Sequence, residues 1–524
     1  MAARPSFYIT TAIPYANGAP HIGHAYERIA ADVIARSKRL DGYDVLFLTG
    51  MDEHGQKMQQ TAARLDLTPQ ALADRTARQF ESVATLLNAR ADDIVRTTED
   101  RHRIAAQEIW RRMQEKGDIY QSTYAGWYSI RDEAYYDEGD LVLGPEGKKL
   151  APTGTPVEWV EEASYFFRLS SYGDRLLTLY DKQPNFIVPD KYRNEVVSFV
   201  RRGLTDLSIS RTTFDWGVPV PGDPAHVMYV WVDALTNYLT GTGFPDASAE
   251  RARFWPAQAH VIGKDITRFH AVFWPAFLMS ADLPVPRQIV VHGFLFNRGE
   301  KMSKSTGNVV DPVRLIGTYG VDPIRYFLLR EVPFGQDGNY SHEAIVNRIN
   351  ADLANDLGNL AQRSLSMIGK NCEGVVPRHM LLSEADQALL DAAYGLPGTV
   401  RAALRDFALH QMLADIWQVV AEANRYFASE EPWIKRKSDP ERMATVLYVT
   451  AEVLRVIALL VQPFMPASME RLLDLLGVAP SARNFSDATV EHQLQSGTPL
   501  PSPVAIFPRY VEPEAAPPGS ATAA

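Results

Sequence analysis

Hydrophobic positions follow two alternating periods over residues 1–116, as expected for strands and helices in turn. The β-branched and aromatic run 6–13 and the run 44–50 predict strands. Between them, one helical face carries four apolar positions: Ile29, Ala30, Val33 and Ile34. Gly42 can end this helix, and Thr68 can cap the next one. The alternation predicts an open parallel sheet, whose ligands bind beyond the carboxyl ends of its strands.

The pattern changes twice further along the chain. Short aromatic segments and turns over 117–221 predict an inserted connective domain, and residues 222–296 return to the α/β pattern. A loop and short elements over 297–342 lead into 343–510, where long segments of 3.6-residue period predict a helical bundle. The composition of 511–524 predicts a disordered tail. The predicted fold is a Rossmann-like α/β parallel sheet with an inserted domain, followed by an all-α bundle.

Composition narrows the class of protein. The 524 residues are 46% hydrophobic and 22% charged, which indicates a soluble protein of several domains. A net charge of −10 argues against a non-specific nucleic-acid coat but permits a local basic patch. We expect a cytoplasmic location, because no signal sequence precedes the first strand and Arg455 interrupts the most apolar late stretch. Cys372, the only cysteine, excludes intrachain disulfides and zinc sites built from several thiolates.

The stretch PYANGAPHIGH places His21 and His24 where the first strand meets its helix. Three interpretations are open. The pair could be half of a metal site, or it could provide polar capping of the helix. It could also belong to a phosphate site, because unpaired N–H groups and the helix dipole attract anions at a helix start. Gly23 would let a nucleotide approach closely.

A second polar segment, RGEKMSKSTG, follows the last strands of the α/β region. It could be a solvated basic loop and nothing more. Gly299 and Gly307 bracket it, however, so the segment can move. Lys301 and Lys304 could then close on a polyphosphate as charge shifts during a reaction.

Together the two segments resemble the paired signature of class I aminoacyl-tRNA synthetases, and within that class the chain is similar to the methionyl-tRNA synthetase family. The similarity extends over AIPYANG, TGMDEHG, YVWVDAL, IGKDITRFH, FWPAFL, VHGF, KMSKSTGN, ANDLGNLAQR and EEPWI. The synthetases for isoleucine, valine and leucine carry a larger editing insertion than residues 117–221. The cysteine enzyme needs a cysteine-ligated zinc that a single Cys cannot supply.

The resemblance implies that methionine and ATP, with Mg²⁺, give methionyl-adenylate and pyrophosphate, and that methionine is then transferred to initiator and elongator tRNA(Met). The catalytic residues it implies are His21, His24, Lys301 and Lys304. The ATP-binding residues it implies are Tyr15, His21, Gly23, His24, Gly263, Asp265 and Lys304.

A methionine pocket is also implied by the resemblance, formed by Ile13, Tyr15, Asp52, Trp231, Ala234, Leu235, Tyr238, Ile266 and His270. Asp52 would bind the substrate ammonium group, and aromatic contact would suit the thioether. Without the resemblance, the stripe on the predicted helix would be ordinary core packing, and Asp52, Glu53 and His54 an ordinary polar loop. Leu235 stands where some relatives have proline.

In the helical region, the resemblance assigns anticodon contacts to Asn359, Arg363 and Trp433. Trp433 would stack on an unpaired base, as single-stranded loops are commonly recognised. The alternatives are a surface polar pair and an aromatic residue buried at a helix start. The run 435–437 (KRK) supplies local positive charge beside Trp433.

The chain departs from the family pattern in two ways, and each departure leads to an expectation. The stretch YAGWYSIRDEAYY lacks the cysteines that hold zinc in many relatives, so we expect no protein-bound metal. The C-terminal dimerisation domain of some relatives has no counterpart, so we expect a monomer without membrane association. Another adenylyltransferase of this superfamily would lack the helical region over 343–476, and a non-catalytic tRNA-binding paralogue would not need His21, His24, Lys301 and Lys304.

Overall fold

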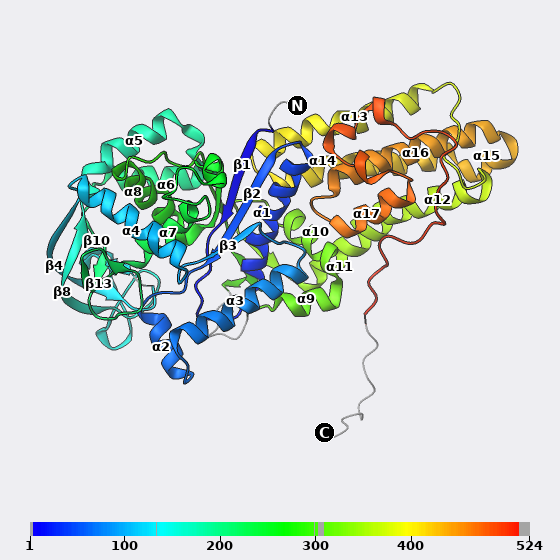
Figure 1. Ribbon diagram of the computed structural model, residues 1–524. Coiled ribbons are helices and arrows are strands. Elements are labelled where there is room, and N and C mark those ends of the chain that lie inside the picture. The colour runs from blue at the N-terminus through cyan, green and yellow to red at the C-terminus, as the bar shows by residue number, and fades with distance from the viewer. Residues whose placement is uncertain (1–3, 133, 298, 302–308, 513–524) are drawn as a thin grey trace, which may run out of the picture. The chain divides into compact units, whose positions relative to one another are not determined.

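The computed structural model describes residues 4–132, 134–297, 299–301 and 309–512 (Figure 1). The chain forms two compact units. The first extends to Leu295 and also includes residues 301–313 and 334–338. The second takes 296–300, 314–333 and the chain from Asn339 onward. The region 297–342 therefore contributes to both units, and the finer boundaries drawn from the sequence remain predictions.

A six-stranded parallel sheet organises the first unit and confirms the predicted Rossmann-like fold. Its order is β3 (Asp93–Arg96), β2 (Asp44–Met51), β1 (Ser6–Thr11), β14 (Ala259–Gly263), β15 (Ile289–His292) and β9 (Ile187–Val188). The central strands are buried almost throughout, as expected when helices cover both faces of a parallel sheet. Figure 1 shows β1, β2 and β3 side by side.

Two predicted helix-end signals of this unit are confirmed. Thr68 accepts a hydrogen bond from the Ala71 N–H and caps α3, and Gly42 takes a positive φ just after α1. The helix α1 packs against β1, β2 and β14. The helices are α1 (Ile22–Leu40), α2 (Gln56–Arg64), α3 (Pro69–Leu86), α4 (Asp100–Glu115), α5 (Gly173–Lys182), α6 (Asp190–Arg201), α7 (Val230–Thr240) and α8 (Trp274–Ser280).

The predicted insertion contains small antiparallel sheets. The largest has the order β10 (Leu207–Ser208), β8 (Glu158–Phe167), β4 (Ile119–Ser129) and β5 (Ala134–Tyr136). A second sheet pairs β6 (Val142–Leu143) with β7 (Lys149–Leu150). In a third sheet, β11 (Ser210–Arg211) and β12 (Pro219–Val220) pair with β13 (Asp223–Met228), which lies just beyond the predicted insertion. The segment is not wholly separate, because β9 joins the parallel sheet beside β15. The strand β9 was not predicted, because two residues are too few to give a periodic signal in the sequence.

Where the chain passes between the units, three short strands pair in the order β17 (Glu300–Lys301), β16 (Leu295–Asn297) and β18 (Gly338–Tyr340). The short elements expected after the basic loop are two helices, α9 (Pro312–Tyr319) and α10 (Val321–Glu331). Gly320 separates them with a φ of 86°, a conformation that favours glycine.

The second unit is helical, as predicted. Its further elements are α11 (His342–Arg348), a π-helical segment (Ile349–Gly358), α12 (Asn359–Asn371), α13 (Glu384–Arg405), α14 (Leu409–Glu430), α15 (Pro432–Ser438), α16 (Pro440–Val461) and α17 (Pro466–Leu475). The helices α13, α14 and α16 pack against one another (Figure 1). Among the described residues, α16 alone has the length and composition of a membrane-spanning helix, but 94% of its most apolar stretch is buried within the protein. Burial of this kind is typical of a core helix.

Candidate active site

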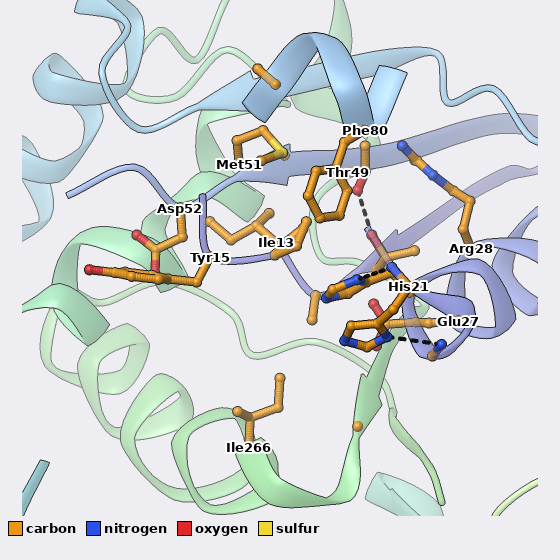
Figure 2. Close-up of a pocket in the computed structure, with 18 of the residues that line it drawn as sticks. Ile13, Tyr15, His21, Glu27, Arg28, Thr49, Met51, Asp52, Phe80 and Ile266 are labelled. Carbon is orange, nitrogen blue, oxygen red and sulfur yellow. Dashed lines mark hydrogen bonds between the residues drawn. The ribbon is translucent and has the colours of Figure 1, made fainter. Parts of the chain in front are cut away.

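A cavity of about 940 Å³ opens in the first unit at the carboxyl ends of β1, β2 and β14. Figure 2 shows Tyr15 and Asp52 toward one end of this pocket and His21 and Glu27 toward the other, with Ile13 between them. The strand ends point backbone and side-chain groups into one space because the strands run parallel. The pocket therefore lies where the sheet topology predicts a ligand site.

His21 and His24 form a capping box at the start of α1. The Gly23 N–H donates to His21 Nδ1 at 3.1 Å, and the His21 N–H donates to His24 Nδ1 at 3.2 Å. The two rings stack with centroids 3.8 Å apart. Because each Nδ1 accepts a hydrogen bond, each neutral ring carries its proton on Nε2. The cap thus makes both imidazoles hydrogen-bond donors at the edge of the pocket.

Gly23 is required by the capping imidazole itself. A Cβ at this position would lie 2.9 Å from His21 Cε1 and 3.0 Å from His21 Nδ1. The same reasoning applies to Gly263, where a Cβ would lie 2.8 Å from the Asp265 carboxylate. Both glycines let a polar side chain fold back over the main chain beside the pocket.

The three polar residues of the motif TGMDEHG make different contacts at the end of β2. Asp52 lines the pocket, and its main chain pairs with Tyr15 on the neighbouring strand end. Glu53 is fully buried and accepts a hydrogen bond from Arg96 Nε at 2.7 Å. His54 is also buried and contacts Asp233 of α7. All three residues are therefore buried and do not form an ordinary solvent-exposed polar loop.

The predicted methionine-binding residues form two layers. Those that line the pocket are Ile13, Tyr15, Asp52, Trp231 and Ile266. Those that lie buried outside its lining are Ala234, Leu235, Tyr238 and His270. The side chains of α7 thus provide both the wall of the pocket and the core behind it, which is why periodicity alone could not separate the two interpretations.

A chain of hydrogen bonds fixes the buried layer. Tyr238 Oη lies 2.7 Å from His270 Nε2, and His270 Nδ1 lies 3.0 Å from the Ile266 carbonyl oxygen. The carbonyl can only accept, so Nδ1 carries the proton and Nε2 accepts from the tyrosine hydroxyl. Burial lowers the pKa of His270 to about 4, so this imidazole is neutral near pH 7.

The lining of the pocket also includes Gly263 and Asp265, whose predicted contact with ATP stays a prediction, and a pair that the sequence analysis missed. Glu27 Oε2 lies 2.8 Å from His292 Nε2, at the end of β15. Burial raises the pKa of Glu27, and the bond to Glu27 raises the pKa of His292 against the effect of burial. Glu27 follows His24 by three residues on α1, a spacing that puts both on one helix face and could have revealed it.

The basic loop is only partly within the described residues. Lys304 lies outside them, as does the rest of 302–308, and β17 ends at Lys301. Val310, just after these residues, accepts a hydrogen bond at its carbonyl oxygen from the Ile22 N–H in the first turn of α1. The roles assigned to Lys301 and Lys304 therefore remain predictions.

The predicted anticodon residues come together in the second unit. Arg363 of α12 lies with its guanidinium 5.0 Å from the ring centre of Trp433 and 5.1 Å from that of Phe427. Asn359 is exposed one turn before it. The Trp433 side chain is 37% exposed, so the alternative of a buried helix-start aromatic is wrong. The cluster presents a flat aromatic ring beside positive charge.

Within residues 4–132, 134–297, 299–301 and 309–512, no group of three or more His, Cys, Asp or Glu side chains could hold a metal ion. In the cysteine-free stretch YAGWYSIRDEAYY, Asp132 accepts hydrogen bonds from Tyr136 Oη at 2.9 Å and Thr155 Oγ1 at 2.6 Å, and from Thr153. The expectation of a metal-free protein stays a prediction.

Comparison with known proteins identifies the family. The family described as "tRNA synthetases class I (M)" matches residues 7–365, and "Anticodon binding domain of methionyl tRNA ligase" matches residues 376–516. A methionine–tRNA ligase of Brucella suis is 63% identical over 510 residues, covering 97% of this chain and 99% of that protein. One of Mycobacterium bovis is 58% identical over 513 residues, covering 97% and 98%.

The solved structures agree with the sequences. Mycobacterium tuberculosis methionyl-tRNA synthetase in complex with methionyl-adenylate has 57% identity and a TM-score of 0.94, over 96% of this chain and 100% of that one. Its apo form has 54% identity and a TM-score of 0.89, over 98% and 100%. With the histidine-capped pocket at the strand ends and the two matched domains in order, the chain belongs to the methionyl-tRNA synthetase family of class I aminoacyl-tRNA synthetases.

Proposed function

We infer that this chain is a methionine–tRNA ligase. It activates methionine with ATP to give methionyl-adenylate and pyrophosphate, and then transfers methionine to the 3′ end of tRNA(Met). The observation that carries this inference is the pocket at the strand ends, in a fold that matches a methionyl-tRNA synthetase solved with methionyl-adenylate. The matching anticodon-binding domain supports tRNA as the acceptor.

In the first step, the methionine carboxylate attacks the α-phosphorus of ATP and pyrophosphate leaves. The protein has to align the two substrates and stabilise negative charge on the phosphate oxygens. We assign this stabilisation to the Nε2–H groups that the capping box creates on His21 and His24. Lys301 and Lys304 would neutralise the leaving pyrophosphate.

The substrates would occupy the two ends of the pocket. Asp52 would bind the methionine ammonium group, while Trp231 and Ile13 contact the thioether chain. Asp265 would accept hydrogen bonds from ribose hydroxyls at the other end, beside Gly263. This arrangement brings the methionine carboxylate to the middle of the pocket, near the start of α1.

Recognition of tRNA would take place in the second unit. Trp433 and Arg363 would stack with unpaired anticodon bases, and Asn359 would hydrogen-bond to a base edge. Both initiator and elongator tRNA(Met) carry the same anticodon, so we propose that both are substrates.

Three finer points complete the proposal. Mg²⁺ would enter with the phosphates of ATP, because it prefers oxygen ligands and is commonly bound through substrate phosphates. We also propose that the chain works as a monomer. It would act in the cytoplasm, where ribosomes consume charged tRNA.

Pyrophosphate–ATP exchange with each of the twenty amino acids tests the function. We expect strong exchange with methionine and little with the others, followed by methionylation of tRNA(Met). Exchange that is absent, or that does not depend on methionine, would contradict the assignment.

A further inference from the structure

A buried carboxylate connects three segments behind the pocket. Asp233 of α7 has no solvent exposure, and imidazoles contact both of its oxygens. His54 Nδ1 lies 2.6 Å from Oδ2, and His102 Nε2 of α4 lies 2.7 Å from Oδ1. His54 belongs to the loop after β2, so a single side chain joins that loop to two helices.

The two bonds differ in their relation to the pocket. His54 follows Asp52 by two residues, and Asp233 follows Trp231 by two residues. Asp52 and Trp231 both line the pocket, so the bond between His54 and Asp233 ties together the two walls that face methionine. His102 instead contacts Thr240 with its other ring nitrogen, at 3.0 Å, and no residue of α4 lines the pocket.

The hydrogen bond between His54 and Asp233 strongly constrains the positions of both residues. A buried carboxylate needs hydrogen-bond donors, and bonds to a charged acceptor are stronger than neutral ones. Although burial opposes it, the two imidazoles lower the pKa of Asp233 to about 2, which keeps the carboxylate ionised near pH 7. Between Asp52 and His54, Glu53 is held on another side by Arg96. The His54 bond is therefore a direct hydrogen bond between this loop and α7.

We propose that His54 and Asp233 are positioning residues for methionine, and that their hydrogen bond fixes the distance between Asp52 and Trp231. The inference rests on the proposed function. Neither residue lines the pocket, so each acts through its neighbour two positions earlier. Losing the bond would weaken methionine binding selectively, because ATP binds at the other end of the pocket.

Two substitutions of His54 separate positioning from bulk stability. The amide nitrogen of Asn falls near the place of Nδ1, whereas that of Gln falls near Nε2, one methylene further along the side chain. Both variants lose the imidazole ring and its edge contact with Trp216. His54→Asn should retain a near wild-type KM for methionine. His54→Gln should raise that KM by about tenfold or more, with the KM for ATP within about twofold of wild type.

His102→Asn is the matched control, because it removes the other bond to Asp233 without touching the Asp52 loop. It should lower the thermal midpoint about as much as His54→Gln does while leaving the KM for methionine near wild type. Equal KM values in the His54→Gln and His102→Asn variants would overturn the proposal. So would a rise in the KM for ATP that parallels the rise for methionine.

If His54→Gln does not fold, Asp233→Asn decides the point, since the uncharged amide keeps the volume but weakens both bonds. A selective rise in the KM for methionine supports the proposal, and an unchanged KM overturns it. Loss of the proposed function itself would look different, because the wild-type protein would then show no methionine-dependent exchange at all.

Discussion

At the scale of single residues, His21 carries two functions that can be separated. Its Nδ1 caps α1, and its Nε2–H is the proposed donor to phosphate. Asparagine is a good N-cap but has no second donor at the place of Nε2. The capping function and the catalytic function therefore predict different outcomes for one substitution.

We predict that His21→Asn keeps the free energy of unfolding within about 0.5 kcal/mol of wild type and lowers methionine-dependent exchange by about 10²–10³-fold. His21→Ala should show the same loss of exchange and cost about 1 kcal/mol of stability as well. Chemical denaturation and exchange assays on both variants provide the measurement. Normal exchange in His21→Asn would show that the residue is only a cap.

A second residue-scale prediction concerns pH. The pKa of His270 is lowered to about 4 by burial, against about 6.5 in an unfolded chain. The unfolded state binds a proton first as pH falls, so the contribution of the neutral imidazole is present above pH 6.5 and is lost between pH 6.5 and 4. This difference in pKa between the folded and unfolded states corresponds to roughly 3 kcal/mol in the free energy of unfolding. As the pH falls from 6.5 to 4, the free energy of unfolding should therefore decrease clearly less in His270→Gln than in wild type. Urea denaturation at several pH values measures this.

At the scale of elements, the short helix α15 presents Trp433 and is held by an ion-pair network. Arg442 of α16 lies 2.8 Å from Glu430 and also contacts Asp386, which is fully buried. Glu430 in turn lies 3.1 Å from Lys435 of α15. The hydrogen bonds from Arg442 and Tyr426 lower the pKa of Asp386 although burial opposes them.

Arg442→Met should cost about 3 kcal/mol of stability in the second unit, because Asp386 keeps its burial but loses its cation. Methionine-dependent exchange, which needs only the first unit, should remain near wild type in the folded variant, and tRNA charging should weaken. Thermal unfolding combined with the two assays tests this. An Arg442→Met variant as stable as wild type would show that the network contributes no net stability.

The hairpin of β4 and β5 gives a second prediction at this scale. Asp132, in the turn between β4 and β5, accepts hydrogen bonds from Tyr136 of β5 and from Thr155 outside the hairpin. Prolonged chelation should therefore leave the thermal midpoint unchanged, whereas Asp132→Ala should lower it by breaking several bonds to one charged acceptor. Zinc retained in stoichiometric amount after chelation, measured by elemental analysis, would contradict the expectation.

At the scale of the whole molecule, the two reaction steps need different parts of the chain. Methionine activation uses the pocket of the first unit, while charging also needs tRNA recognised by the second unit. A substitution in the anticodon cluster should therefore affect one assay and spare the other.

Trp433→Ala should reduce charging of tRNA(Met) by roughly ten- to a hundredfold, because base–aromatic stacking is worth ~1–3 kcal/mol. Pyrophosphate exchange should stay near wild type, and the thermal midpoint should change little because the side chain is 37% exposed. Parallel losses in exchange and charging would reject the anticodon role. Phe427→Leu, beside the same guanidinium but buried, is the control for a packing defect.

Much of the fold and the site could be read from local signals. The strands β1 and β2, the helix α1, the cap at Thr68 and the helical second unit follow from periodicity and end signals, which depend on neighbouring residues only. The pairing of β9 with β15 and the bond between Glu27 and His292 could not be read in this way. Each pairing joins residues far apart in the chain, and local periodicity gives no information on such a partner.

The sequence by itself determined the family, the pocket at the strand ends and the histidines at the start of α1, because each is encoded by a short contiguous motif. Only the tertiary structure decided which members of a motif face the pocket. In TGMDEHG, Asp52 lines the pocket, while Glu53 and His54 are satisfied by Arg96 and Asp233. The physical reason is that a buried polar side chain takes its role from its hydrogen-bond partner, and that partner comes from a distant part of the chain.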